Sequence, residues 1–140
     1  MNIKVKYLAD IDTINSAHKG EWYDLRSAED IVMKAGEFKL IPLGIATQLP
    51  DGYEAHVVPR SSTFKNYHII QTNHMGVIDN AYRGQWMFPA YAIKDTVIPK
   101  NERICQFRLV KTQPEANIEI VDKLSATERG AGGFGSSGRV

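Results

Sequence analysis

One short stretch of this chain, residues 76–84, combines side-chain types that could act together in acid–base chemistry. Between its two glycines it carries the carboxylate of Asp79, the phenol of Tyr82 and a guanidinium. Because glycine accepts tight backbone geometry, we expect Val77 and Ile78 to form a short strand with Asp79 at the lip of a hairpin. A carboxylate in such a place can act as a general base, and a polar surface turn is the alternative.

The C-terminal residues 129–139 are a second stretch with chemical potential. They contain five glycines, the neighbouring Ser136 and Ser137, and Arg129 and Phe134. Backbone N–H groups of small residues, hydroxyls and a guanidinium suit an anion such as phosphate, and an aromatic ring can stack on a base. A flexible tail without a function is the alternative, because ordering many glycines costs backbone entropy.

Length and composition fit one domain without a highly charged partner. The chain has 140 residues, and 17 Lys and Arg against 16 Asp and Glu give no reason to expect nucleic acid. No apolar run is long enough to span a membrane, and the alternating residues 1–6 do not form a signal peptide. We therefore expect a cytoplasmic protein without a membrane partner. The single cysteine, Cys105, is expected to be a reduced core residue.

The elements that must position these stretches are predicted to be short strands, because apolar and polar residues alternate between turn residues. Pro42 and Gly44 favour an edge strand or a bulge in the segment that contains them. Residues 9–20 are expected to be a loop with at most a helical turn. Beyond one short helix, no pattern with a 3.6-residue period is sustained, so the fold class is all-β, a barrel or sandwich. The predicted strands cover residues 3–8, 38–46, 53–58, 67–72, 77–78, 86–93, 97–98, 103–110 and 118–121.

Five stretches then occur in a fixed order. They are residues 23–30 (YDLRSAED), 59–62 (PRSS), 76–84 (GVIDNAYRG), 103–107 (RICQF) and 129–138 (RGAGGFGSSG). Taken together they resemble the five signatures of the trimeric dUTPase (deoxyuridine 5'-triphosphate nucleotidohydrolase) family, although Trp22 stands where glycine is common. Each stretch is weakly specific by itself, and five in order make a strong signal.

The resemblance implies an architecture and an activity. Residues 1–125 are expected to form a distorted jelly-roll β-barrel, and residues 126–140 a flexible Gly-rich C-terminal arm. The implied assembly is a homotrimer with shared active sites, over which the arm closes as a lid. The implied enzyme is a Mg2+-dependent dUTP diphosphatase of nucleotide metabolism, which hydrolyses dUTP to dUMP and pyrophosphate. It would supply dUMP and limit uracil incorporation into DNA. The sequence identifies no regulatory protein partner.

The resemblance also implies residue roles. Asp79 is expected to orient and deprotonate the water that attacks the α-phosphorus. Tyr82 is expected to pack under the deoxyribose, Asn73 to pair with uracil, and Phe134 to stack on uracil. Asp24 is expected to contact metal-bound water, in the outer sphere of Mg2+. The other expected substrate-binding residues are Arg60, Ser61, Gly76, Ile78, Gln106, Arg129, Gly135, Ser136 and Ser137.

Two other functions fit parts of this pattern. A deoxycytidine triphosphate deaminase has a related fold, but deamination without zinc would need a glutamate base near the pyrimidine C4, and the matched carboxylate here is Asp79. The second alternative is a non-catalytic trimer, which binds a protein partner and uses dUTP as a switch. The product separates the three functions, because it is pyrophosphate, ammonia or neither.

Overall fold

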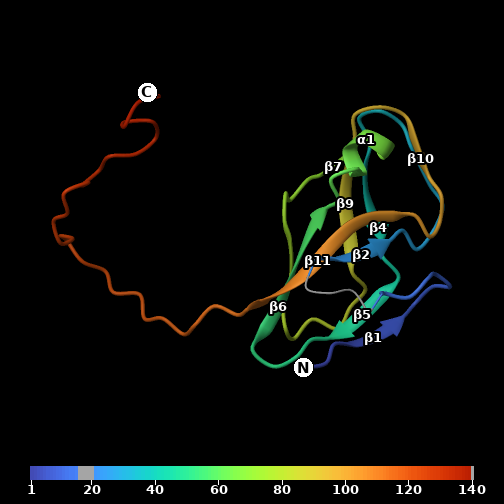
Figure 1. Ribbon diagram of the computed structural model, residues 1–140, viewed down its shortest axis with the longest axis horizontal. Helices are drawn as coiled ribbons and strands as arrows, with labels where there is room; N and C mark the ends of the chain where they lie inside the picture. Colours follow the sequence, from blue (N-terminus) through green and yellow to red (C-terminus); the bar gives the residue numbers. More distant parts are fainter. Residues whose placement is uncertain (16–20, 140) are drawn as a thin grey trace.

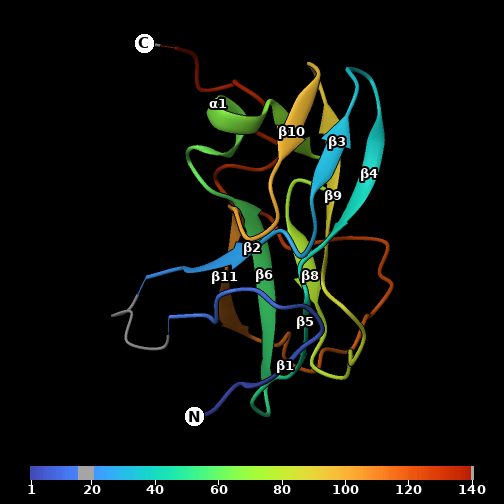
Figure 2. The same ribbon diagram turned by 90° about the vertical axis from the view of Figure 1, so that its right-hand side faces the viewer.

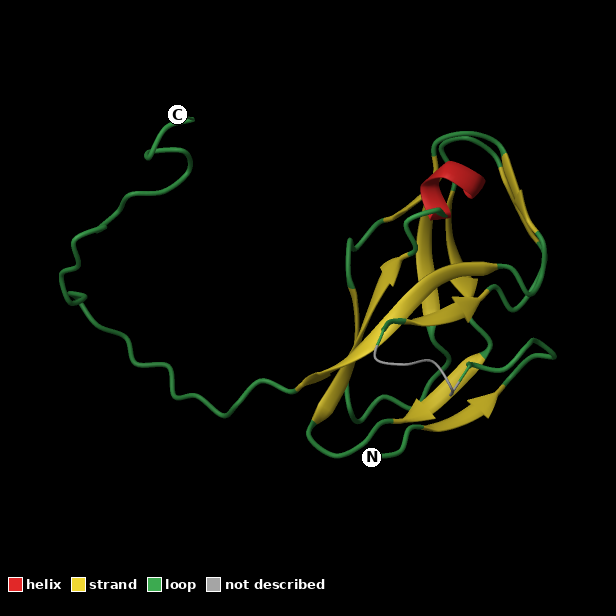
Figure 3. Ribbon diagram, in the orientation of Figure 1, coloured by secondary structure: helices red, strands yellow, loops and turns green. Residues whose placement is uncertain are grey.

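Short β-strands form almost all of the regular structure (Figures 1 and 3). The computed structural model of the chain describes residues 1–15 and 21–139, so part of the predicted 9–20 loop lies outside the described residues. The elements are β1 (Lys4–Tyr7), β2 (Tyr23–Arg26), β3 (Ile31–Met33), β4 (Phe38–Pro42), β5 (Ile45–Gln48), β6 (Tyr53–Pro59), α1 (Thr63–Tyr67), β7 (Ile69–Gln71), β8 (Gly76–Ile78), β9 (Met87–Ala92), β10 (Thr96–Ile98) and β11 (Arg103–Lys111).

In the described part of the chain, the strands pair antiparallel into four small sheets. The largest has the order β2-β11-β6-β8, and a second has the order β4-β9-β7. Two further pairs are β1-β5 and β3-β10, the latter seen at the top of Figure 2. The longest ladder joins β6 to β11, from Cys105 opposite Pro59 to Lys111 opposite Tyr53. This ladder crosses the body of the protein.

The β6–β11 ladder has one face on the core. Phe107 and Val57 lie opposite each other and are 1% and 2% exposed, whereas the neighbouring Gln106 points to the other face. The Phe107 ring lies 5.2 Å from Trp86, edge to face, and 5.4 Å from Tyr23. Buried area and aromatic contact both stabilise this arrangement. The inner faces of the sheets thus share one apolar core.

The all-β prediction is confirmed, and several element boundaries are not. The predicted strand 67–72 is wrong at its start, because Tyr67 ends α1 and His68 takes a left-handed conformation with φ 55°. β7 begins only at Ile69. A five-residue helix is too short for a 3.6-residue period to show in the sequence. No helical turn occurs in residues 9–15, and β2 and β3 were not predicted.

The predicted strand 38–46 is two strands in different sheets. β4 is the edge of its sheet and pairs with β9, whereas β5 pairs with β1. The chain changes sheet at Gly44, where φ is +71° and a Cβ atom would lie 3.0 Å from Ile11 and 3.1 Å from Ala28. Both the backbone angle and the space therefore require glycine at this position.

The predicted strand 118–121 is absent. After β11 the chain leaves the body and extends away from it (Figure 1), and residues 113–139 contain no helix or strand. Ile118 and Ile120 are 85% and 95% exposed. A strand needs a partner for its backbone groups, and this segment meets none in the described chain.

The expected hairpin at Asp79 is also absent. β8 pairs with β6, while the next strand along the chain, β9, belongs to the other large sheet. Residues 79–86 therefore cross between sheets. No helix in the described ranges has the length and apolar character needed to cross a membrane.

Replacing Phe107 by alanine should test the core. We expect Phe107→Ala to lower the free energy of unfolding by about 3–5 kcal/mol, because it leaves a cavity against Trp86. Denaturant unfolding at one fixed protein concentration measures this change. Val97→Ala, at a position 63% exposed, should change stability by less than about 0.5 kcal/mol. Equal losses in the two variants would contradict the assignment of Phe107 to the core.

Candidate functional site

One cavity brings together five of the predicted site residues. Asn73, Gly76, Ile78, Asp79 and Tyr82 line a cavity of about 280 Å³ beside β8. Most of the remaining wall is apolar, and a mainly apolar cavity with a few polar groups is typical of a small-molecule site. The other lining residues are Leu40, Val57, Val77, Gln85, Trp86, Met87 and Pro89.

Gly76 lines the cavity at a place that leaves little room for a side chain. Gly76 lies opposite Val57 in the β6–β8 ladder. A Cβ atom on Gly76 would lie 3.3 Å from the Val57 Cβ and 3.5 Å from the Gln71 Nε2. Its φ is not positive, so the need for glycine comes from space and not from the tight turn that we expected.

Hydrogen bonds anchor the loop that carries Asp79. The Tyr82 N–H donates to the Asp79 carbonyl at 3.0 Å, which closes a turn directly after β8. The Asn80 Nδ2 donates to the carbonyls of Pro50 and Tyr53 at 2.9 and 2.8 Å. Arg83 adds a bond from its Nη1 to the Asn80 carbonyl at 2.6 Å. Asn80, which the sequence analysis did not single out, therefore ties the Asp79 loop to the β5–β6 turn.

Tyr82 closes the same loop. Its hydroxyl donates to the Gln85 carbonyl at 2.8 Å, and its ring lies against Gly84. A Cβ atom on Gly84 would lie 2.5 Å from the Tyr82 Oη, so a side chain at this position would displace the Tyr82 ring. Tyr82 is 44% exposed, which leaves part of its ring available to a ligand in the cavity.

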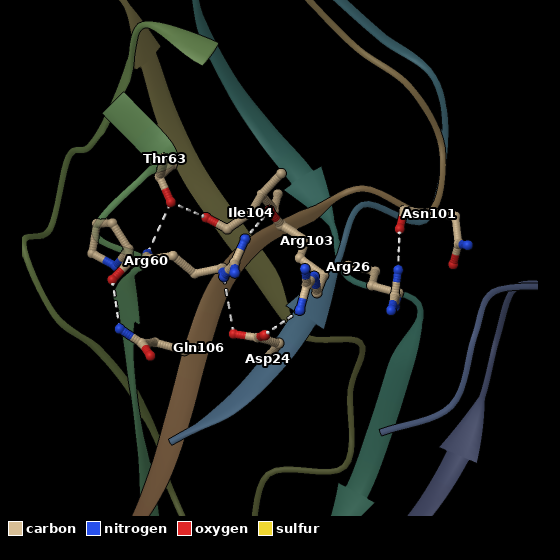
Figure 4. Close-up of polar contacts among 9 residues, drawn as sticks. Asp24, Arg26, Arg60, Thr63, Asn101, Arg103, Ile104 and Gln106 are labelled. Atoms are coloured by element: carbon tan, nitrogen blue, oxygen red, sulfur yellow. Dashed lines mark hydrogen bonds and ion pairs between the residues drawn. The ribbon is translucent and has the colours of Figure 1, made fainter. Parts of the chain in front are cut away.

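A second group lies around Asp24 of β2 and includes Arg60, which follows β6, and Arg103 of β11 (Figure 4). The Arg60 Nε lies 3.0 Å from the Asp24 Oδ1, and the Arg103 Nη1 lies 3.2 Å from its Oδ2. Both carboxylate oxygens thus face a guanidinium. The three side chains are partly exposed, so these ion pairs orient the groups more than they stabilise the fold.

Thr63 holds the turn that presents Ser61. The buried Thr63 hydroxyl donates to the Ile104 carbonyl at 2.8 Å and accepts from the Arg60 N–H at 2.8 Å (Figure 4). Ser61 itself is exposed between them. The Gln106 Nε2 donates to the Pro59 carbonyl at 3.0 Å, just before the same turn. The sequence analysis did not single out Thr63. The feature of the sequence that could have indicated it is a hydroxyl-bearing residue shortly after the end of a predicted strand.

Two other ionisable groups near β11 are neutral. The Tyr67 hydroxyl donates to the Glu102 carboxylate at 2.6 Å, and burial together with this bond raises the pKa of Tyr67 to about 12. The pair joins the end of α1 to the turn before β11. Burial raises the pKa of the Cys105 thiol, which is free and fully buried, so the prediction of a reduced core cysteine is confirmed.

The arm residues form a third group, away from both others. Residues 129–139 make local turns, with Arg129 Nε donating to the Gly132 carbonyl at 2.6 Å and the Ser136 N–H to the Gly133 carbonyl at 3.1 Å. Phe134 is fully exposed. Figure 1 shows this segment at the far end of the extended chain. None of the predicted arm residues, which include Gly135 and Ser137, lines the cavity.

The two groups on the body also stay apart. Asp24 and Gln106 are opposite each other on the face of the large sheet that points away from Phe107. The cavity includes Val57, from the inner face, and lies at the β8 edge, whereas β2 forms the opposite edge of this sheet. Its lining contains neither Asp24, Arg60, Ser61 nor Gln106. One chain therefore presents its predicted site residues in three separate places.

Comparisons with known proteins agree with the sequence signatures. The dUTPase family profile matches residues 11–138. The chain is 56% identical to the SPbeta prophage-derived deoxyuridine 5'-triphosphate nucleotidohydrolase YosS of Bacillus subtilis (strain 168), over 99% of each chain. It is 43% identical to the deoxyuridine 5'-triphosphate nucleotidohydrolase of Clostridioides difficile, over 98% of each.

Solved structures of similar proteins share the fold. A mutant dUTPase of Staphylococcus bacteriophage 80alpha with dUpNHpp has a TM-score of 0.84 and 25% identity, over 99% of each chain. A mutant dUTPase from phage phi11 of S. aureus has a TM-score of 0.77 and 18% identity, over 88% of this chain and 98% of that one. That structure is described as revealing the coordination of a structural Mg(II) ion.

Replacing Asn80 should loosen the Asp79 loop. Asn80→Ala removes both bonds to the β5–β6 turn, so we expect a loss of about 1–2 kcal/mol in the free energy of unfolding. Amide hydrogen exchange at Tyr82, whose N–H bonds to Asp79, should become faster. The control is Asn66→Ala, at an exposed position on α1. An unchanged exchange rate at Tyr82 would show that Asn80 does not anchor the loop.

Proposed function

This chain belongs to the dUTPase family and is a dUTP nucleotidohydrolase, and we propose that Asp79 activates the water that attacks the α-phosphorus of dUTP. The observation that carries this role is that Asp79, on an anchored loop, is one of the residues that line a cavity of about 280 Å³. A fixed carboxylate within reach of one water molecule is a suitable general base. The bond from the α-phosphorus to the oxygen that bridges it to the β-phosphate then breaks, which yields dUMP and pyrophosphate.

The cavity suits the deoxyuridine part of the substrate. We assign uracil to the wall formed by β8 and Asn73, where Gly76 and Ile78 offer backbone groups and apolar contact. The Tyr82 ring, partly exposed beside them, packs under the deoxyribose and leaves no space for a 2′-hydroxyl. These roles place a flat base and an apolar sugar face against the apolar part of the cavity.

The triphosphate needs groups that this cavity lacks. Arg60 and Gln106 lie at the other face of the large sheet, next to the turn that carries Ser61. Arg129, Ser136 and Ser137 lie on the arm. We propose that three copies of the chain form a homotrimer, in which each site takes these groups from different subunits. The separation of the three groups within one chain supports this assembly.

The arm is the part of the chain that we expect to reach a neighbouring subunit. Phe134, Ile118 and Ile120 are exposed apolar side chains on an extended segment, and docking on a second copy would remove them from water. We propose that Phe134 stacks on the uracil when the arm closes, while the backbone N–H groups at Gly135–Ser137 meet the terminal phosphates. An element that orders only over substrate acts as a lid.

The residues fit Mg2+ held mainly by the substrate. Within residues 1–15 and 21–139, no three His, Cys, Asp or Glu side chains gather where they could hold a metal ion. Both Asp24 oxygens already face arginines, so Asp24 is suited to a contact through water. Mg2+ keeps several waters and prefers phosphate oxygens, so a site without a carboxylate cage is consistent with it. When bound, Mg2+ would neutralise charge on the phosphates.

Product analysis tests this function against its rivals. The purified chain with Mg2+ is incubated with dUTP, dCTP, dTTP or UTP, and pyrophosphate and ammonia are both measured. Pyrophosphate release confined to dUTP is the expected result. Ammonia from dCTP, or no product from dUTP, would overturn the proposed reaction.

Asp79→Asn should separate binding from catalysis. The amide keeps the shape of the side chain and cannot accept the proton of the water, so we expect kcat to fall by about 100- to 10,000-fold. Binding of the product dUMP, measured by calorimetry, should stay within a few-fold of the wild type. Normal turnover by this variant would remove Asp79 from the mechanism.

Mixed assemblies test whether sites are shared between chains. A chain that lacks residues 128–140 and a full-length Asp79→Asn chain should each be folded and nearly inactive. Co-expression should restore dUTP hydrolysis, because a site can then take Asp79 from one subunit and the arm from another. The control mixes the truncated chain with a truncated Asp79→Asn chain, in which no arm is present. Equal activity in both mixtures, or full activity of the truncated chain alone, would contradict the shared site and the lid.

A further inference from the structure

Gln71 is a polar side chain in the core beside the cavity. It ends β7, whose alternation buries Ile69 and Gln71 and exposes Ile70, and Gln71 is only 4% exposed. A buried amide is costly unless its donors and acceptors are used. The partners of Gln71 are therefore informative about why the chain carries a polar residue at this position.

The Gln71 amide links a backbone carbonyl to Asn73. Its Nε2 lies 3.1 Å from the Val57 carbonyl oxygen and 2.8 Å from the Asn73 Oδ1. A carbonyl oxygen can only accept, so the NH2 end of Gln71 must face Val57, and a flipped amide would bring two oxygens together. The same NH2 group then donates its second hydrogen to Asn73.

This link decides which end of Asn73 remains available. Since the Asn73 Oδ1 accepts from Gln71, the Asn73 NH2 group is the end left for a ligand. Asn73 lines the cavity, and its turn is held by the His74 N–H, which donates to the Gln71 carbonyl at 3.2 Å. Gln71 therefore holds Asn73 through both its main chain and its side chain.

Stability alone does not account for glutamine at position 71. Among the described residues, the Gln71 Oε1 has no hydrogen-bond partner although it is buried. An unpaired buried oxygen is destabilising, and methionine, of similar length, would avoid it. A buried polar residue that leaves one atom unpaired while it orients a neighbour at a binding site is typical of a functional constraint.

We propose that Gln71 is a positioning residue that determines pyrimidine specificity, by fixing Asn73 as a hydrogen-bond donor toward the base. This inference rests on the proposed placement of uracil in the cavity. Uracil offers a carbonyl oxygen at C4, whereas cytosine offers an amino group there. A fixed NH2 donor pairs with the oxygen of uracil and meets the amino group of cytosine donor to donor. An Asn73 side chain that was free to flip would accept either base.

Gln71→Met tests this role through substrate selectivity, which would not change if Gln71 served only to stabilise the fold. The ratio of kcat/KM for dUTP to kcat/KM for dCTP is measured by pyrophosphate release, beside the affinities for dUMP and dCMP. We expect the selectivity for dUTP to fall by about tenfold or more, because Asn73 can then turn either end to the base. The thermal unfolding midpoint is measured beside this ratio, because the variant removes the unpaired Oε1 but also leaves the Val57 carbonyl without its Gln71 donor. Gln48→Met, at an exposed position on β5, is the matched control and should leave the ratio unchanged.

The outcomes separate this inference from the proposed function. If the wild-type protein does not prefer dUTP, the proposed function fails. If the wild type prefers dUTP and Gln71→Met keeps the same selectivity, or loses activity equally with both substrates, the role of Gln71 is overturned. Should Gln71→Met not fold, Gln71→Leu provides a shorter apolar side chain for the same comparison.

Discussion

The antiparallel ladder between β6 and β11 is the constraint on which the rest of this structure depends. Its register places Phe107 and Val57 on the core and Gln106 on the opposite face. β2 is added to one side of this ladder and β8 to the other. A slip of one residue would turn the core face toward solvent, because side chains alternate with a period of two. The same register therefore fixes the core, the Asp24 group and the cavity beside β8.

Side chains that bind backbone carbonyls then fix the loops. Thr63 holds the Ser61 turn to β11, Asn80 holds the Asp79 loop to the β5–β6 turn, and Gln71 connects Asn73 to β6. Each bond reaches across the sequence to a segment 14 to 41 residues away. Rigid positioning of a reacting group is worth more to an enzyme than the modest stability of such bonds. Loops without regular secondary structure can therefore still hold their side chains in fixed positions.

Alternation and turn residues were sufficient to predict the all-β class and most strands. They were insufficient where the outcome depends on what lies beside a segment. Residues 118–121 alternate as a strand does, but a strand forms only against a partner. Tyr67 is of a residue type that is common in strands, yet it is the last residue of α1. The helix ends there because His68 takes a left-handed backbone conformation. The burial of Gln71 was accessible in principle, since period-two alternation from Ile69 points it inward.

The sequence by itself determined the family, the chemistry of dUTP hydrolysis and the side chains available for it, because those depend on residue types and order. Tertiary structure decided where each side chain lies. It brought Asn73, Asp79 and Tyr82 to one cavity and left Gln106 on the other face of the sheet. It also decided which end of the Asn73 amide is free, through Gln71. The physical reason is that strand register and hydrogen-bond partners are set between segments distant in the chain, and no local pattern encodes them.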